Sequence, residues 1–594
     1  MTLAKLASGS VRAVPVMLLA LALVTASACS KEKEGFVEGT DQLVSDGGLD
    51  AADECMFQCS LDGRAVISTC TGEVVDTCKD DQVCGGALCQ APCAAAAADR
   101  SSNGCEFYFQ KPRFTKSVPN SCYAAFVVNS SNEAVKLELE LEGKAMDISR
   151  ALFRADPSTM ALSQLEGPLA PGDSAILFLS DRDPTRVYSL ADSITYVGCP
   201  SGVVPATYTD FKMNGTGMGS SFHLKSNVPV GLATIYPFGG AKSFTPTATL
   251  VLPVATWGTE HILVNSWDTA WTGAPAAQIV AAEDGTDVTI VPRVDIQNGV
   301  GVTGGLAGEP TTYRLDKGQF LQLVQNQQLT GSFVSSNKPI TTIGGHACAD
   351  IPTNVEACDI LAQQIPAADQ WGSEYVAVAY RSRVGNEHEP VPYRIVAARD
   401  GTQLDYDPVV PPGAPLSLSA GESATFWSGT GDAFVVRSQD VDHPIYVAAY
   451  MTGGEQYGGR GDPDFVNLVP TGQYLNSYAF YADPTFNDSS LVIVRAKTRG
   501  EFKDVWLECA NGNVPDFHPI GARGEYEYAR VDLAVSGGTG AKFGDHLCQN
   551  GLQRLHSDGA FTATIWGWDA YASYAYTGGL AQRKLVKTPL GIVH

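Results

Sequence analysis

The stretch Gln278-Ile-Val-Ala-Ala-Glu-Asp-Gly-Thr-Asp-Val-Thr-Ile290 decides the fold class, because it returns as Tyr393-Arg-Ile-Val-Ala-Ala-Arg-Asp-Gly-Thr-Gln-Leu-Asp405. Each copy predicts a strand, an Asp-Gly turn and a second strand, with the glycine supplying the positive φ of a tight hairpin. A second hairpin is predicted further on in each copy, at Leu315-Asp-Lys-Gly318-Gln319 and at Leu418-Ser-Ala-Gly421-Glu422. Turn chemistry accounts for these aspartates, so we do not interpret them as catalytic.

A third element follows the two hairpins and sets the period of the repeat. We predict a strand, a polar turn, a proline and a second strand at Val334 to Ile340, at Val436 to Ile445 and, in an earlier copy, at Leu224 to Val230. The three prolines lie 110 and 105 residues apart, and Trp257-Gly258 precedes Trp371-Gly372 by 114 residues. A period of this size, with weaker copies near residues 124 and 491–561, indicates about four units.

The body from about residue 104 onward has the pattern of an all-β protein. Short β-branched and aromatic runs are broken by Gly, Pro, Asn and Asp roughly every ten residues, and no helical period is sustained. About six or seven short strands in each repeat favour tandem β-sandwich-like units over residues 106–594. A β-propeller with enlarged blades is the alternative, because a propeller blade usually has about four strands and 40 to 45 residues.

The N-terminus predicts export and a lipid anchor. Lys5 and Arg12 precede an apolar run over 14–24 that is too short to span a bilayer. Small residues then lead to Cys29, in a pattern that resembles the bacterial lipoprotein signal, although Ala26 stands where leucine is usual. We therefore predict a lipoprotein-type signal peptide over 1–28, lipidation of Cys29, and a flexible acidic tether over 29–54. An ordinary signal peptide cleaved after Ala28 is the alternative.

Composition supports the same compartment. The 594 residues include 64 Asp plus Glu against 40 Lys plus Arg, a net charge of −24. This balance argues against a nucleic-acid partner, because affinity for phosphates depends on Lys and Arg. Fifteen cysteines are typical of an exported protein. The predicted location is the bacterial outer membrane or cell surface, with the lipid as the only membrane contact.

The cysteines predict a disulfide-rich module over 55–105. Without Cys29 fourteen cysteines remain, and eight of them crowd into this module. Some have zinc-like separations, yet the module contains no histidine, so disulfides are favoured over zinc. The eight are Cys55, Cys59, Cys70, Cys78, Cys84, Cys89, Cys93 and Cys105. The other six permit three sequential pairs and are Cys122, Cys199, Cys348, Cys358, Cys509 and Cys548.

Four patterns in the body invite a functional interpretation. His346 lies near Cys348, Cys358 and two aspartates, as in a metal or Cys-His site, but a disulfide loop with a polar histidine is favoured. Arg460-Gly461-Asp462 spells an integrin-type tripeptide, which we interpret as incidental. The acidic pairs Asp181-Arg-Asp183 and Asp462-Pro-Asp464 offer carboxylates to calcium, although solvated turns are favoured. The aromatic residues that are candidates for sugar stacking, with core packing as the commoner role, are Tyr457, Trp427, Trp566 and Trp568.

The order of these motifs resembles the IgGFc-binding protein N-terminal domain family, most clearly over residues 250–500. The motifs are residues 279–290, Asn337 to Cys348, Cys358-Asp359, Gln363 to Pro366, Trp371-Gly372, Tyr450 to Gly453, Gly461 to Pro463 and Val469-Pro470. The family is named for binding the Fc part of immunoglobulin in a mucin-associated animal protein. Bacterial relatives with a Cys-rich leader look like secreted or lipid-anchored surface proteins, and the resemblance implies the same for this chain.

Two functions are therefore expected. The preferred one is a lipid-anchored surface protein that binds or adheres to an extracellular protein or glycan through a repeated β scaffold, without catalytic, cofactor-binding or metal residues. A structural calcium ion is the one cofactor considered. The alternative is an exported hydrolase of polysaccharide or peptide that uses a pair of carboxylates.

Overall fold

The computed structural model describes residues 57–60, 64–68, 71, 73–115, 119–156, 159, 161–190, 193, 195–209 and 214–591. The predicted signal peptide and tether, the lipidation candidate Cys29, and the disulfide candidates Cys55 and Cys70 lie outside the described residues. Within the described part of the chain, no helix is long and apolar enough to cross a membrane.

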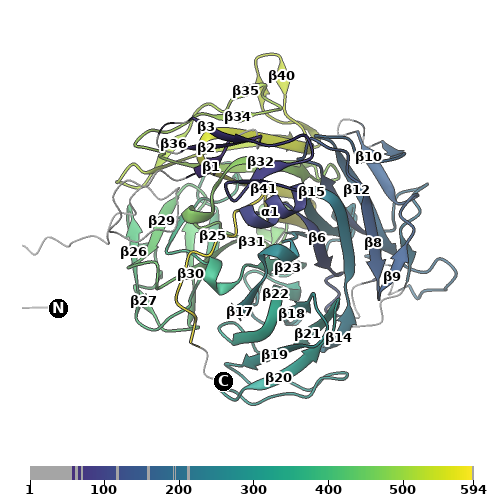
Figure 1. Cartoon of the computed structure of the whole chain (residues 1–594). Helices are drawn as coiled ribbons and strands as arrows, with labels where there is room; N and C mark the ends of the chain where they lie inside the picture. Colours follow the sequence, from purple (N-terminus) through teal and green to yellow (C-terminus); the bar gives the residue numbers. More distant parts are fainter. Residues whose placement is uncertain are drawn as a thin grey trace, which may run out of the picture. The chain divides into compact units, whose positions relative to one another are not determined.

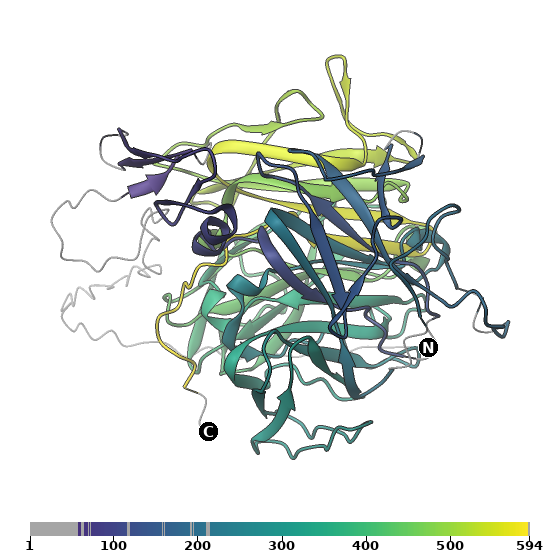
Figure 2. The same ribbon diagram turned by 45° about the vertical axis from the view of Figure 1, so that its right-hand side comes forward.

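A small disulfide-rich region precedes the body. Its elements are β1 (Phe57–Cys59), β2 (Ala65–Ser68), β3 (Val74–Thr77), β4 (Val83–Gly85), β5 (Leu88–Gln90) and α1 (Pro92–Asp99). The helix α1 begins with proline and continues in alanine, the best helix former, and ends where Arg100 adopts a left-handed conformation. Figure 2 shows this region in purple at one edge of the body.

Disulfides replace an apolar core in this region. They join Cys59 to Cys84, Cys78 to Cys89 and Cys93 to Cys105. The disulfide prediction is confirmed for these six cysteines, and they are not available to zinc. Cys105 lies in the first strand of the body, so the third disulfide fastens the region to it. With three more in the body, these disulfides are typical of an extracellular or secreted protein.

The body is almost entirely antiparallel β-structure, and its strands fall into four successive segments, which we number 1 to 4. Segment 1 contains β6 (Gly104–Phe109), β7 (Tyr123–Val128), β8 (Leu137–Leu141), β9 (Lys144–Met146), β10 (Leu152–Ala155), β11 (Leu162–Gln164), β12 (Ser174–Asp181), β13 (Thr207–Tyr208), β14 (Gly217–Ser220), β15 (Phe222–Tyr236) and β16 (Thr247–Leu250). Segment 2 contains β17 (Gly258–Ile262), β18 (Pro275–Ala281), β19 (Thr286–Val291), β20 (Thr311–Leu315), β21 (Gln319–Val324), β22 (Phe333–Ala349) and β23 (Asp359–Ile365).

The last two segments complete the body. Segment 3 contains β24 (Glu374–Ala377), β25 (Pro390–Ala397), β26 (Thr402–Asp407), β27 (Ser417–Leu418), β28 (Ser423–Gly429), β29 (Phe434–Ser438), β30 (Ile445–Met451) and β31 (Asp464–Asn467). Segment 4 contains β32 (Leu475–Ala482), β33 (Asp488–Ala496), β34 (Val505–Leu507), β35 (Gly512–Asn513), β36 (His518–Ile520), β37 (Tyr526–Val535), β38 (Gly538–Thr539), β39 (Lys542–Phe543), β40 (His546–Leu547), β41 (Gly551–Asp569) and β42 (Ala572–Thr577). Short 3₁₀ turns lie at η2 (Gly240–Lys242), η3 (Val254–Thr256), η4 (Ala368–Gln370), η5 (Gly454–Tyr457) and η6 (Thr471–Gln473).

One long strand organises each segment. It is β15, β22 or β41, and in segment 3 the pair β29 and β30 takes its place. The first half of β22 pairs with β17 and β19, and its second half pairs with β18 and β23. Segments 1 and 4 repeat this rule with β15 and β41, so each builds two curled sheets joined along the long strand. In segment 3, β29 and β30 belong to two separate sheets. In segment 2, apolar side chains such as Ile279, Val288 and Val334 fill the space between the sheets.

The predicted Asp-Gly hairpins are wrong in one respect. Gly285 and Gly401 do adopt positive φ, of 68° and 69°. However, β18 and β19 do not pair with each other, because the chain crosses at Gly285 from one sheet of the segment to the other. The turn at Gly318 between β20 and β21 crosses in the same way. A crossing turn and a hairpin need the same residue types, and the long strand, far away in sequence, decides between them.

The predicted break before each proline is correct only in segment 3, where Pro444 lies between β29 and β30. In segments 1 and 2 the long strands run through Pro229 and Pro339. The polar residues there mark the bend at which the strand leaves one sheet for the other. Proline is tolerated at such a bend because its missing N–H costs no ladder hydrogen bond.

The last strands of the four segments meet at the centre of the body. We call β16, β23, β31 and β42 the inner strands; they start 112, 105 and 108 residues apart. Each lies beside the next, and β42 lies beside β16, so the order is cyclic. Gln363 of β23 places its Nε2 atom 2.9 Å from the carbonyl oxygens of Ala248 and Phe465 and 2.8 Å from that of Ala575. Figure 1 shows the segments following one another around this centre, from β15 through β22 and β30 to β41.

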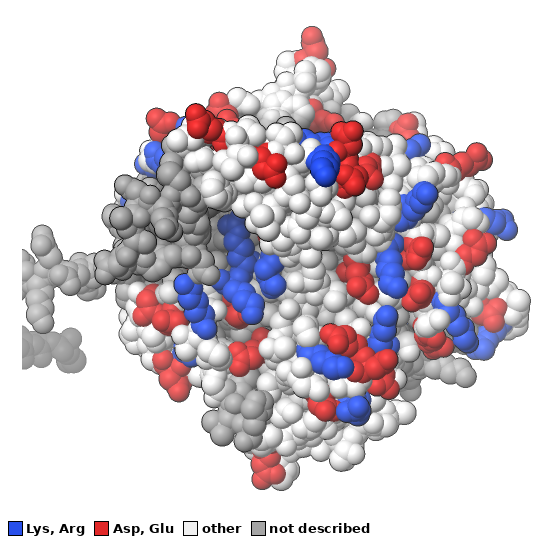
Figure 3. Space-filling view, viewed as in Figure 1, with Lys and Arg blue, Asp and Glu red and all other residues white. Residues whose placement is uncertain are grey.

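A second set of hydrogen bonds links the segments where the inner strands end. Gln370 donates to the Thr256 carbonyl, and Gln473 donates to the Gln370 carbonyl. Gln473 also forms hydrogen bonds with residues of the C-terminal stretch 580–583. Arg100 donates hydrogen bonds both to the Gln582 carbonyl in this stretch and to the Thr256 carbonyl. The two ends of the body thereby close the cycle. Figure 3 views the side on which α1 lies, and Lys and Arg side chains gather there in a hollow near the middle of the face.

Candidate functional site

A cavity of about 390 Å³ opens at the other end of the inner strands, where these strands begin. All four segments contribute to it, with Thr245 just before β16, Cys358 before β23, Asp462 before β31 and Tyr571 before β42. We call it the axial cavity. Its lining residues are Thr115, Thr195, Phe244, Thr245, Thr272, Cys348, Ala357, Cys358, Asp462 and Tyr571.

Asp462 is the one charged side chain among the described residues that line the axial cavity. It is only 1% exposed, and its Oδ1 accepts a hydrogen bond of 3.0 Å from the Gly454 N–H. Its own N–H donates to Ser573 Oγ at 2.8 Å. Its Oδ2 has no hydrogen-bond partner within the described part of the chain. A buried carboxylate oxygen without a partner is costly, so its position at a cavity makes Asp462 a candidate for contact with a ligand.

Three more buried carboxyl groups lie around Asp462. Asp359 accepts from the Ser573 N–H at 3.1 Å, Asp464 from the Phe465 N–H at 2.7 Å, and Asp350 from Thr272 Oγ1 at 2.6 Å. The second oxygen of each has no hydrogen-bond partner among the described residues. The start of the inner strands is therefore a strongly acidic region of the interior.

Burial decides the protonation of these groups. It raises the pKa of Asp462 to about 7, against the opposing effects of the Gly454 N–H and the Arg383 charge. Burial also raises the pKa of Asp359 well above its usual value, and the charges of Asp462 and Asp464 add to this shift. The pKa of Asp464 is likewise raised well above its usual value by burial. Asp462 therefore changes its charge near neutral pH.

A buried ion pair holds the loop that carries Asp462. The side chains of Arg383 and Glu389 are 0% exposed, with Nε and Oε1 2.7 Å apart. Arg383 also donates to the Thr452 carbonyl at 2.8 Å, at the start of this loop. Gly461 adopts a φ of 69°, and a side chain there would meet the Arg383 guanidinium at 3.0 Å. Only glycine fits this position without strain, so the backbone before Asp462 is fixed.

Two aromatic side chains, Phe244 and Tyr571, line the axial cavity. Phe244 is 45% exposed and Tyr571 38% exposed, and their ring centroids lie 6.5 Å apart. Phe244, Tyr571 and the lining residue Ala357 all have positive φ, of 57°, 49° and 97°. Positive φ is uncommon for residues other than glycine, and such backbone strain clusters at functional sites. Three strained residues at one cavity support its assignment as the site.

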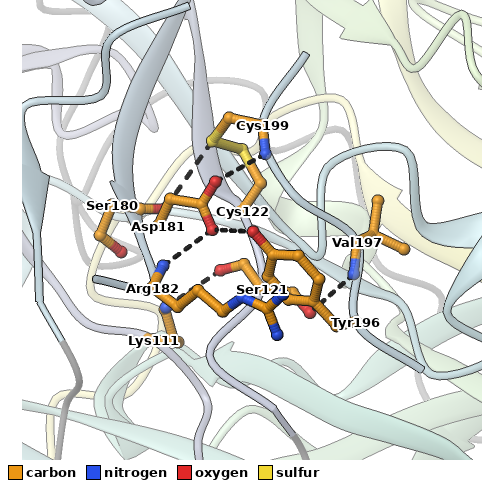
Figure 4. Close-up of a disulfide and its surroundings, with 9 residues drawn as sticks. All are labelled: Lys111, Ser121, Cys122, Ser180, Asp181, Arg182, Tyr196, Val197 and Cys199. Atoms are coloured by element: carbon orange, nitrogen blue, oxygen red, sulfur yellow. Dashed lines mark hydrogen bonds between the residues drawn. A yellow bond between two sulfur atoms is a disulfide. The ribbon is translucent and has the colours of Figure 1, made fainter. Parts of the chain in front are cut away.

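The Cys122–Cys199 disulfide lies four residues after the lining residue Thr195 and braces this stretch of the chain; Figure 4 shows the disulfide with its neighbours Tyr196 and Asp181. Asp181 accepts from the Tyr196 hydroxyl at 2.9 Å and from the Cys199 N–H at 2.8 Å (Figure 4). Both carboxylate oxygens of Asp181 are thus engaged in hydrogen bonds. Asp181 is a buried structural residue, in contrast to the calcium ligand or solvated turn considered from the sequence.

His346 is also structural. Its Nδ1 accepts from the Cys348 N–H at 3.1 Å, and its Nε2 lies 3.0 Å from the Asp268 carbonyl oxygen. Burial lowers the pKa of His346 to about 4, so the ring is neutral. Cys348 and Cys358 form the predicted disulfide, and Cys509 pairs with Cys548.

The aromatic residues selected from the sequence are not at the cavity. Trp566 and Trp568 are buried in the core, and Trp427 packs against another core cluster. The ring of Tyr457 stacks on the Arg383 guanidinium, with 4.0 Å between the ring centroid and the guanidinium carbon. The integrin-type tripeptide is not displayed, because its Asp462 is buried.

Sequence reasoning missed Phe244 and Tyr571. Neither belongs to a motif, and their shared position just before an inner strand is visible only after the four inner strands have been aligned. The exposed Trp271, at 78%, was also missed; it is adjacent to the lining residue Thr272.

Comparison with known proteins relates this site to a family. The family model described as IgGFc binding protein matches residues 247–567, slightly more than half of the chain. The chain belongs to this family. The matched residues include Asp462 and the three buried aspartates around it, whereas Phe244 and Tyr571 lie outside the match.

The human protein named IgGFc-binding protein is 24% identical over 314 residues, which cover 50% of this chain. The chain spans 5% of the length of that relative. Among solved structures, an anti-sigma factor domain-containing protein from Clostridium clariflavum is 10% identical and covers 60% of this chain and 85% of its own, with a TM-score of 0.11. That score is too low to relate the two folds.

Proposed function

We propose that this chain is a surface protein that binds an extracellular protein or glycan at the axial cavity. The observation that carries the proposal is the convergence of four segments on one cavity, with two partly exposed aromatic rings and a buried carboxylate oxygen that has no partner among the described residues. Specific binding sites typically combine a concave surface, aromatic contacts and a few placed polar groups. The human relative's name refers to binding of the IgG Fc part, which makes Fc one candidate ligand.

We further propose that Cys29 anchors the chain in the outer membrane through lipid. The disulfides support export, and the small residues before Cys29 support lipidation. Mass spectrometry of the mature N-terminus tests this. We expect a diacylglycerol-modified Cys29; a mature chain starting at an unmodified Cys29, at Ser30 or at Lys31 would contradict it.

The repeated strand pairing of the four segments supports a proposal about their arrangement. We propose that the four segments are copies of one sandwich-like unit, arranged about the inner strands in the cyclic manner of a propeller. Two sheets joined by a long strand make the sandwich, and the cyclic contact of the inner strands makes the ring.

An array tests the binding function. The mature protein would be applied to extracellular proteins, including IgG Fc, and to glycans. We expect saturable binding to at least one component, lost in Asp462→Asn and retained in Asp483→Asn. Asp483 is a matched control because it is equally buried, has a partnerless oxygen among the described residues and does not line the cavity. An array without saturable binding would contradict the proposal.

A hydrolase is the second candidate, and one observation favours it. Asp462 has a pKa of about 7 beside other carboxyl groups, as a general acid needs. Turnover of a polysaccharide or peptide panel that disappears in Asp462→Asn would establish this activity. A panel without turnover would contradict the hydrolase.

A further inference from the structure

We infer that the axial cavity binds a positively charged organic group of the ligand, an ammonium or guanidinium of the kind that Lys and Arg side chains carry. The inference rests on the proposed binding function and names the chemistry of the group that enters the cavity.

The first argument is charge. Asp462 is the one carboxylate among the described residues that line the cavity, and its buried Oδ2 has no hydrogen-bond partner among those residues. The nearby cation Arg383 is committed to Glu389 and to backbone carbonyls. A cation that enters the cavity therefore lies beside the Asp462 carboxylate in a desolvated place, where an ion pair with hydrogen bonds is strong.

The second argument is the arrangement of the other lining groups. Thr245 lines the cavity, and its Oγ1 is buried without a hydrogen-bond partner among the described residues, so it is available as a second acceptor. Phe244 and Tyr571 also line the cavity and are partly exposed, and aromatic rings attract cations. An alkylammonium group matches this set, because it brings three N–H donors and an apolar stem. A neutral hydroxyl brings one donor and no charge.

The third argument separates an organic cation from a metal ion. Among the described residues, no group of three or more His, Cys, Asp or Glu side chains is arranged to hold a metal. Calcium needs six to eight oxygen ligands, whereas the described residues that line the cavity supply one carboxylate, threonine hydroxyls and aromatic rings. Calcium binding is therefore an outcome of the test that would overturn the inference.

The cavity should bind cations better as the pH rises through about 7. Only the ionised form of Asp462 attracts a cation, and burial sets its pKa near this value. The charged or titratable groups that face Asp462 are Arg383, Asp350, Asp359 and Asp464. Burial also raises the pKa of the three other aspartates, and Arg383 remains cationic.

The test is calorimetric titration of the full mature protein with n-butylammonium chloride, and with n-butanol as the neutral probe of the same shape. At pH 8 we expect n-butylammonium to bind at least about tenfold more tightly than n-butanol, and to lose about tenfold in affinity at pH 6. Asp462→Asn should remove this preference, and Tyr571→Leu should weaken it with the carboxylate intact. Asp483→Asn should retain it, and circular dichroism would verify the fold of each variant.

Three outcomes would overturn the inference. They are equal binding of the two probes, an ammonium preference that survives in Asp462→Asn, and calcium chloride binding that depends on Asp462 without ammonium binding. The array, which tests the proposed function, and the ammonium titration, which tests the inference, can fail independently. An array ligand without an ammonium preference would overturn only the inference, whereas ammonium binding with an empty array would overturn only the proposed function.

Discussion

Gln363 is the residue whose substitution tests the central packing of the body. It is buried, and its amide reaches the carbonyl oxygens of Ala248, Phe465 and Ala575, one on each of the other three inner strands. Gln363→Met keeps an unbranched side chain of similar size and removes the donors. Two N–H groups shared among three carbonyls, at about 1 kcal/mol for each bond, give an expected loss of about 2–3 kcal/mol in the free energy of unfolding.

The assay is equilibrium unfolding in guanidinium chloride, followed by tryptophan fluorescence. The midpoint should fall while the slope of the free energy against denaturant stays the same, because the variant changes stability and leaves the exposed area unchanged. Gln403→Met is the control, since Gln403 is exposed; its effect should stay within about 0.5 kcal/mol. If Gln363→Met is no more destabilised than Gln403→Met, the inner strands do not meet as described.

Three further predictions concern closure, protonation and the cavity wall. Arg100→Met removes the bonds from Arg100 to Gln582 and to the η3 turn, so we expect a loss of about 2 kcal/mol in denaturant unfolding and faster proteolysis of the C-terminal stretch; unchanged proteolysis would contradict closure. The raised pKa of Asp462 stabilises the native state below the unfolded pKa of 3.8, and this contribution is lost as the pH rises through about 7. Between pH 4 and pH 8, the free energy of unfolding of the wild type should therefore fall by up to about 4 kcal/mol relative to that of Asp462→Asn. If the free energies of unfolding of the two proteins change in parallel with pH, the raised pKa of Asp462 is refuted. Cys122→Ala with Cys199→Ala opens a loop with a sequence separation of 77, for an expected loss of about 4 kcal/mol in thermal or denaturant unfolding; a loss below about 1 kcal/mol would contradict its bracing role.

The fold class and period were predictable from the sequence because they depend on local chemistry. Asp-Gly turns and β-branched runs record where strands begin and end, and the recurring prolines record the period although two of them lie inside a long strand. Pairing was not predictable in the same way. The Asp-Gly turn at Gly285 suits a hairpin and a crossing turn equally, and β22, about 50 residues later, decides that the chain crosses.

The candidate site was only partly visible in the sequence. Asp462 stood out as an acidic turn residue, but its burial comes from a loop held by Arg383 and Glu389, which are far from it in sequence. His346 carried two interpretations, and the hydrogen bonds to both ring nitrogens select the structural one. Phe244 and Tyr571 had no signal of their own, because only the cyclic contact of the inner strands brings them together.

A crystal structure of the full mature protein soaked with n-butylammonium chloride tests the account's central claim most directly. The account predicts the ammonium nitrogen in the axial cavity, within hydrogen-bond distance of Asp462 Oδ2 and beside the rings of Phe244 and Tyr571. It would be contradicted by a cavity filled by the chain itself, by a metal ion on Asp462, or by the probe bound only elsewhere.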